Sequence, residues 1–146
     1  TTEIYTLSLH DALPICCFMI KQSSYQAGEG RFCIKMFVSE TDEGLVAQLF
    51  GGEKPHVGAM VLSVPAPGMI NPGAITCTTV VVPLLGHKDD HVAKLAAEQI
   101  ARAAGVPVVV VAGVHVDDAG EKEIKELVDN CQAVTRALLK DLQAAK

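Results

Sequence analysis

The sequence lacks the features of a nucleic-acid-binding or membrane-spanning protein. It carries 12 lysine and arginine residues against 17 acidic residues, a net charge of −5, and the basic residues do not cluster. This balance argues against a nucleic acid or an anionic membrane as the partner. No apolar stretch approaches the ~20 residues that a membrane-spanning helix needs. We therefore expect a soluble protein with no nucleic-acid partner and no membrane partner.

Several motifs of enzymes and metal sites are also missing. None of the five cysteines forms a C-x-x-C pair, and no zinc-ribbon spacing is present. The sequence contains no G-x-S-x-G nucleophile turn, no G-x-x-x-x-G-K-[ST] loop and no G-x-G-x-x-G loop. Cys33 and Cys77 lie in strand-like runs and Cys131 lies on the apolar face of a helical pattern. We expect buried, inert thiols in a reducing cytosol, and hence a cytoplasmic protein.

The first fifteen residues, TTEIYTLSLHDALPI, do not fit the pattern of the remaining chain. Their apolar residues keep neither a helical nor a strand period, and they lack the basic start and unbroken apolar run of a secretory signal. Codon by codon, the stretch corresponds to the in-frame translation of a common short-read sequencing adapter. We therefore expect residues 1–15 to be an artefactual, non-native N-terminal segment. Residues 16–146 have the size of one domain with one core.

The hydrophobic pattern predicts strands first and helices later. Alternation or short β-branched runs predict strands, and apolar residues at spacings of three and four predict helices. The predicted strands are 31–39, 45–50, 57–64, 75–82 and 106–114, and the predicted helices are 92–104 and a long one that begins near Asp118. Asp118 can cap that last helix, with Glu121 three residues on.

This order, β-β-β-β-α-β-α, predicts an α+β fold in a single domain. Hairpin-length links between the first four strands favour a mainly antiparallel sheet, and the helix before the fifth strand allows a crossover. Both helices are expected to pack on the sheet.

The histidines lie where strands end. His56 follows a glycine-rich break, His87 and His91 lie in PLLGHKDDH, and His115 follows Gly113. Glycine allows the backbone to approach a ligand closely, and loops at strand ends commonly build sites. These positions are therefore candidate site residues.

The stretch VVVPLLGHKDDHVAKLAAEQIA is the most informative one. A strand runs into Gly86, His87 and Lys88 and then into a helix that Asp89 or Asp90 can cap. Free N–H groups at a helix start, together with a glycine and a lysine, can bind a phosphate. The alternative is an ordinary capped helix whose histidine and lysine are solvated.

A metal site and a catalytic site are less well supported. His87 and His91 are four residues apart, but a helix that starts after His87 would break that spacing. His115 and Asp117 could complete a metal site only through the fold. Asp117 and Asp118 could act as general acid and base, although a helix cap explains them more simply. We assign no metal ligand and no catalytic residue from the sequence.

Three stretches resemble the small prenylated-flavin chaperone family. They are GGEKPHVGAM, PLLGHKDD before an alanine-rich helix, and VVVVAGVHVDDAGEKEIKELVDNC, and the likeness extends over about residues 32–139. The resemblance implies a non-catalytic protein that binds prenylated FMN and delivers it to, or matures it in, a UbiD-type decarboxylase. A flavin prenyltransferase is the other implied partner.

The resemblance also implies where the cofactor binds. The FMN phosphate would lie at Gly86–Asp90, and His56 and His115 would bond the ring or the ribityl chain. The cofactor-binding residues expected on this basis are His56, Gly58, Gly86, His87, Lys88, Gly113, His115 and Asp117. The order of strands and helices is also similar to that of small proteasome-assembly chaperones, which supports a homodimer.

Two alternatives remain from the sequence alone. One is a small lyase or decarboxylase subunit that uses a His/Asp cluster directly. The other is a protein-assembly chaperone or interaction module that binds no ligand.

Overall fold

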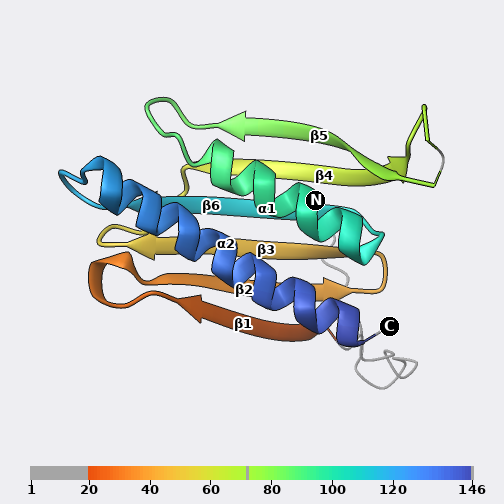
Figure 1. Ribbon diagram of the computed structural model, residues 1–146, viewed down its shortest axis with the longest axis horizontal. Coiled ribbons are helices and arrows are strands. Elements are labelled where there is room, and N and C mark those ends of the chain that lie inside the picture. The colour runs from red at the N-terminus through yellow and green to blue at the C-terminus, as the bar shows by residue number, and fades with distance from the viewer. Residues whose placement is uncertain (1–19, 72, 146) are drawn as a thin grey trace, which may run out of the picture.

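One six-stranded sheet with two helices on one face makes up the structure, a computed structural model that describes residues 20–71 and 73–145. The expectation for residues 1–15 concerns a segment outside the described residues. The strands are β1 (Lys21–Ala27), β2 (Ile34–Thr41), β3 (Gly44–Gly52), β4 (Ala59–Pro67), β5 (Ile75–Pro83) and β6 (Val108–His115), and the helices are α1 (Asp90–Ala104), α2 (Glu121–Ala144) and a 3-10 turn at Gly30–Phe32 (Figure 1). The α+β fold class expected from the sequence is confirmed.

The sheet order is β1-β2-β3-β6-β4-β5. All neighbours are antiparallel except β3 and β6, which pair in parallel from Leu45–Val108 to Gly52–His115. Strand β6 therefore lies between β3 and β4, which are consecutive in the sequence. Helix α1 supplies the crossover that returns the chain to the middle of the sheet.

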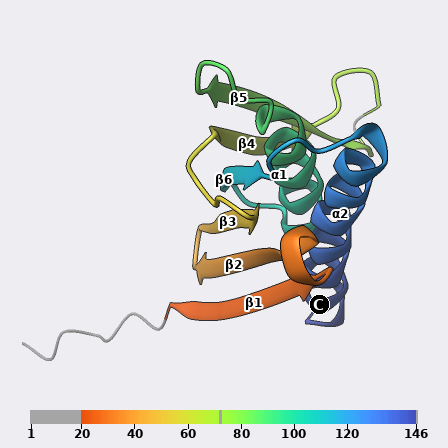
Figure 2. The same cartoon turned by 90° about the vertical axis from the view of Figure 1, so that its left-hand side faces the viewer.

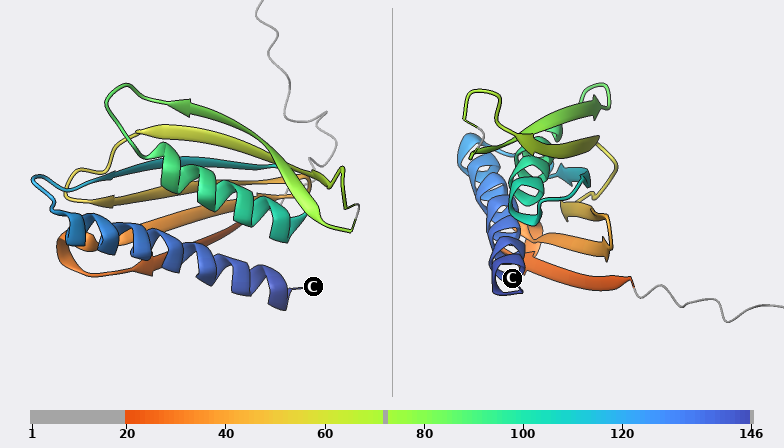
Figure 3. Two further views of the ribbon diagram at one scale, coloured as in Figure 1. Left: turned by 45° about the horizontal axis from the view of Figure 1, so that its top comes forward. Right: turned by 90° about the vertical axis from the view of Figure 1, so that its right-hand side faces the viewer.

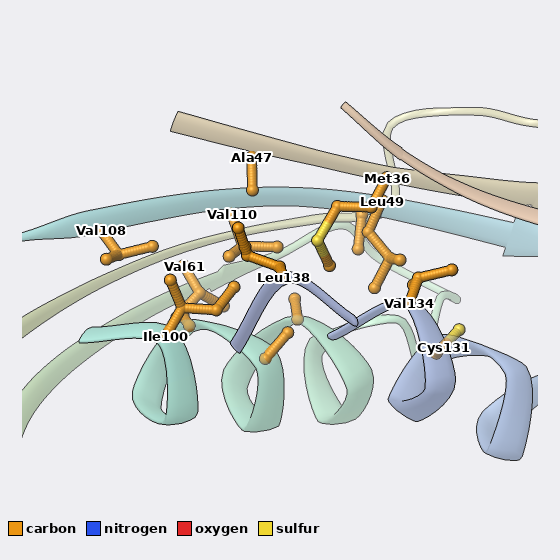
Figure 4. Packing of buried hydrophobic residues seen from close by; sticks show 14 of the residues in the cluster. Met36, Ala47, Leu49, Val61, Ile100, Val108, Val110, Cys131, Val134 and Leu138 are labelled. Carbon is orange, nitrogen blue, oxygen red and sulfur yellow. The ribbon is translucent and has the colours of Figure 1, made fainter. Parts of the chain in front are cut away.

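Both helices cover the same face of the sheet (Figures 2 and 3). Strand residues alternate between this face and the other one, so that β2 reads buried, exposed, buried from Ile34 onward. Helix α1 packs on β4, β5 and β6, and α2 packs on β1 and β2. In the core, Met36 and Leu49 of the sheet lie near Val134 and Leu138 of α2, and Val61 lies near Ile100 of α1 (Figure 4).

The structure differs from the sequence-based expectations in two elements. Strand β1 was not expected, because KQSSYQA shows no apolar alternation. The last helix begins at Glu121, so the expected cap at Asp118 is wrong. The backbone of Asp118 is left-handed, with φ of 53°, whereas an N-cap residue is normally extended. Gly120 takes the cap position instead, and its N–H donates to the Glu123 carboxylate.

No helix in the described part of the chain has the length and apolar character needed to span a membrane.

Candidate functional site at the carboxyl ends of three strands

Three histidines meet at one edge of the sheet. Strands β3 and β6 run parallel, and β5 points the same way because β4 is antiparallel to both β5 and β6. The three strands therefore end at the same edge, on the left in Figure 1. The loop after β3 carries His56, the loop after β5 carries His87, and His115 is the last residue of β6. The topology thus brings together side chains that are far apart in the sequence.

His56 lies at the centre of this group. Its ring centroid is 4.4 Å from that of His87 and 6.1 Å from that of His115. Nε2 of His56 lies 2.9 Å from Nδ1 of His87, and Nδ1 of His56 lies 3.0 Å from the carbonyl oxygen of Lys54. Because a carbonyl oxygen only accepts hydrogen bonds, Nδ1 of His56 carries a proton.

Asp89 supplies a buried carboxylate to the same group. Its side chain is 7% exposed, and its Oδ1 accepts a hydrogen bond of 2.8 Å from the backbone N–H of Val114. Its Oδ2 lies 3.2 Å from Nε2 of His56 and 3.8 Å from Nδ1 of His87. The Asp89 side chain thus lies between a β6 amide and two imidazoles.

The sequence predicts that Asp89 or Asp90 caps helix α1, and the structure has Asp89 at that position without the side-chain hydrogen bond of a cap. Asp90 is already the first helical residue. A backbone amide that is shielded from water is costly to leave without an acceptor, and the Asp89 carboxylate satisfies the partly buried amide of Val114.

Two glycines leave the space that these groups occupy. A Cβ on Gly58 would lie 2.0 Å from Oδ2 of Asp89 and 2.9 Å from Nε2 of His56. A Cβ on Gly113 would lie 1.6 Å from the carbonyl oxygen of His56. The absence of a side chain at both positions lets the His56 loop lie directly against β6 and Asp89.

A second polar network surrounds Asp117. Nε2 of His115 lies 2.9 Å from Oδ1 of Asp117, and the ammonium of Lys54 pairs with the other carboxylate oxygen. Arg31 donates a hydrogen bond of 2.8 Å to the backbone carbonyl of Asp117. The hydrogen bonds from Lys54 and from His115 lower the pKa of Asp117. Asp117 is therefore a carboxylate at neutral pH and has no proton to supply as a general acid.

A pocket of 330 Å³ opens beside the histidines, between the loop before α1 and helix α2. Its lining combines a polar set and an apolar set of residues. The polar set includes Gly86, His87, Lys88, Asp89 and His115, and the apolar set includes Val92, Val114, Val116, Ile124 and Leu127. Gly86, with φ of 84°, occupies the third position of a turn in which the N–H of His87 donates to the carbonyl of Leu84. Such a turn favours glycine there.

Lys88 is the one lysine or arginine among the residues that line this pocket. It is exposed, and its ammonium has no ion pair within residues 20–71 and 73–145. A second cavity of 590 Å³ lies between α1 and α2 and shares Val92, Val128 and Cys131 with the first. The two cavities therefore adjoin, and burial raises the pKa of the Cys131 thiol between them to about 12.

Residues 28–143 match the family described as the prenylated flavin chaperone LpdD-like domain. The chain belongs to this family. No curated protein matches it. Among solved structures, this LpdD-like domain is similar to a chain of a chaperone complex for yeast 20S proteasome assembly, with 9% identity, a TM-score of 0.42, and coverage of 80% of this chain and 99% of that chain.

Four of the eight expected binding residues of this LpdD-like domain line the pocket, and four do not. Gly86, His87, Lys88 and His115 line the pocket. The other four do not line it: His56 and Asp117 hold neighbouring side chains, and Gly58 and Gly113 provide space. His91 lies on α1 and takes no part in the histidine group, as the start of the helix after His87 predicts.

Three residues of the LpdD-like site were not identified from the sequence. The local pattern indicates only a helix cap for Asp89, and it assigns no role to Lys54 or Arg31. Lys54 lies only two residues before His56, and this short spacing could have indicated that Lys54 belongs to the site. Arg31 has no such signal, because its contact with Asp117 joins segments 86 residues apart.

Proposed function

We propose that this domain binds prenylated FMN and delivers it to a UbiD-type decarboxylase, as a cofactor carrier without turnover of its own. Membership in a family of prenylated flavin chaperones supports this proposal. The observation that carries the assignment of the site is a pocket whose lining combines Lys88, which has no ion pair among the described residues, with apolar side chains of β6, α1 and α2. FMN and its prenylated form combine an anionic phosphate with a planar ring system that has an apolar dimethylbenzene side.

In this proposal the phosphate lies at the turn formed by Gly86, His87 and Lys88. The N-terminus of α1 begins two residues after Lys88 and adds its partial positive charge. His115 lines the pocket and is placed to bond the ribityl chain or the ring. His56 lies outside the lining, so it orients His87 rather than touching the flavin. The ring would extend into the adjoining cavity between the two helices.

A homodimer is the second part of the proposal. The sheet face opposite the helices carries exposed apolar side chains on β4 and β5, including Met60, Leu62, Val80 and Val82, which are 44%, 37%, 55% and 49% exposed. They are neighbours in register, since Met60 pairs with Val82 and Leu62 with Val80. A contiguous apolar patch of this kind is a candidate interface, and a second copy presents the same patch for a two-fold symmetric contact.

Isothermal titration calorimetry with prenylated FMN, FMN and riboflavin tests the phosphate assignment. A charge-assisted contact is worth about 1.5–3 kcal/mol, so Lys88→Ala should weaken FMN binding by about ten- to a hundred-fold. Lys140→Ala, near the far end of α2, is the matched control and should leave the affinity unchanged. His115→Ala should alter the flavin absorption spectrum while FMN is still preferred over riboflavin.

Two results would contradict this assignment. Riboflavin binding as tightly as FMN would show that the phosphate is not recognised. Absence of binding by all three flavins would refute the cofactor proposal itself.

A further inference from the structure

Three potential metal-ligand atoms converge at the end of the sheet. They are Nε2 of His56, Nδ1 of His87 and Oδ2 of Asp89, and they lie within 4.8 Å of one another. The separate distances are 2.9 Å between the two nitrogens, 3.2 Å from His56 to Asp89 and 3.8 Å from His87 to Asp89. The atoms come from two loops that follow different strands, so the fold and not one local turn brings them together.

The spacing matches the coordination sphere of a small divalent ion. Ligands about 2.0–2.1 Å from a tetrahedral zinc ion are separated from one another by about 3.3–3.4 Å. The three observed distances bracket this value. An ion placed among the three atoms would therefore need only small side-chain movements.

The hydrogen bonds of His56 and Asp89 to the backbone engage the atoms that point away from this group. The Nδ1–H of His56 donates a hydrogen bond to the carbonyl oxygen of Lys54, which leaves Nε2 as the ring atom that faces the group. Oδ1 of Asp89 accepts from the Val114 amide, which leaves Oδ2 available. Nδ1 of His87 is hydrogen-bonded to Nε2 of His56 at 2.9 Å, and a metal ion would replace this contact. Nε2 of His56 and Oδ2 of Asp89 lie 3.2 Å apart. A cation between them would bind both atoms.

The surroundings also have the form of a prepared site. The other ring nitrogen of a ligating histidine usually donates to a carbonyl or carboxylate, as His56 does here. The Asp89 side chain is 7% exposed and fixed by β6, and Gly58 leaves the space for its carboxylate. A buried carboxylate needs a compensating positive charge, and no lysine or arginine of the described residues pairs with Asp89.

We propose that His56, His87 and Asp89 bind a divalent transition-metal ion of the Zn²⁺ and Co²⁺ class. Two imidazoles and one carboxylate are borderline ligands that favour these ions over Mg²⁺ or Ca²⁺. Three protein ligands leave at least one coordination position open. All three proposed ligand atoms belong to this chain and none belongs to a flavin. Metal binding at this site is therefore independent of the proposed flavin function.

Cobalt titration tests this site directly. His10, Cys16 and Cys17 are potential ligands outside the described residues, so all proteins would carry His10→Ala, Cys16→Ser and Cys17→Ser. After treatment with EDTA, Co²⁺ is added without flavin, and the visible d–d absorption and the calorimetric stoichiometry are recorded. We expect one ion per chain, with displacement by Zn²⁺ and no competition by Mg²⁺.

Matched histidine variants identify the ligands. His87→Ala, at a 38% exposed side chain, should weaken Co²⁺ binding by at least about tenfold. His91→Ala removes a nearby exposed histidine that is outside the group and should leave binding unchanged. Asp89→Asn should also weaken binding, and circular dichroism would show whether it remains folded.

The outcomes separate this site from the alternatives. Saturable binding that His87→Ala loses and His91→Ala retains supports the proposal. Absence of saturable Co²⁺ binding, or equal loss in the His87 and His91 variants, overturns it. Because no flavin is present, either result leaves the flavin titration as a separate test.

Discussion

Gly58→Ala should destabilise the protein and disrupt the histidine group together. The new methyl carbon would lie 2.0 Å from Oδ2 and 2.7 Å from Cγ of Asp89, far inside van der Waals contact. The Asp89 carboxylate must then move and lose its hydrogen bond of 2.8 Å with the Val114 amide. A hydrogen bond to a charged group contributes about 1.5–3 kcal/mol, and an unsatisfied buried amide costs about 1–3 kcal/mol. These contributions overlap, so we expect a loss of about 2–4 kcal/mol in the free energy of unfolding.

Urea denaturation in EDTA, followed by far-ultraviolet circular dichroism, measures this loss without a metal contribution. Gly73→Ala is the matched control, because its Cβ would meet nothing closer than 3.4 Å and no positive φ is involved. The control should remain within about 0.5 kcal/mol of the parent protein. A Gly58→Ala protein as stable as the Gly73→Ala protein would show that Asp89 is not held where the structure places it.

Two further predictions concern the interface and the buried thiol. In light scattering, the parent protein should have about twice the monomer mass of 15.4 kDa. Leu62→Lys should lower the measured mass to that of one monomer and leave the circular dichroism spectrum unchanged. A parent protein that is monomeric at high concentration would contradict the interface. Burial raises the pKa of Cys131 from 9.0 to about 12, so the folded protein keeps this thiol protonated at pH values at which the unfolded chain loses the proton. The resulting contribution to the free energy of unfolding is complete below about pH 9 and is lost as the pH rises toward 12. Between about pH 8 and pH 10 the parent protein should lose about 1.4 kcal/mol more than Cys131→Ala, and parallel pH profiles of the two proteins would refute this.

Most strands and helices were predictable because their sequences carry a strong hydrophobic period or a continuous β-branched run. Val108–His115 reads as a continuous apolar run and forms a central strand with neighbours on both sides. Lys21–Ala27 was missed because it is a polar edge strand, and its conformation depends on pairing with β2. The side-by-side position of β3 and β6 is also tertiary information that periodicity does not contain.

The candidate site was predictable in part, because the strand ends that carry its histidines were predictable. Histidines at strand ends could be identified from the sequence, and the parallel direction of β3, β5 and β6 brings them to one edge. The role of Asp89 could not be identified, because the local pattern D-D before a helix predicts a cap. The competing partner, the amide of Val114, lies 25 residues further along the chain. The Asp89 carboxylate therefore accepts from this distant, partly buried amide and not from an amide of its own helix.

Cofactor transfer is the most direct test of the proposed carrier function. The purified chain is loaded with prenylated FMN, freed of unbound cofactor by gel filtration, and mixed with an apo UbiD-type decarboxylase, whose substrate consumption is then followed. We predict that the loaded chain restores decarboxylation, that the isolated chain shows no turnover, and that Lys88→Ala carries less cofactor into the assay. Retention of the cofactor on the chain with an inactive decarboxylase, or turnover by the isolated chain, would contradict the proposed carrier function.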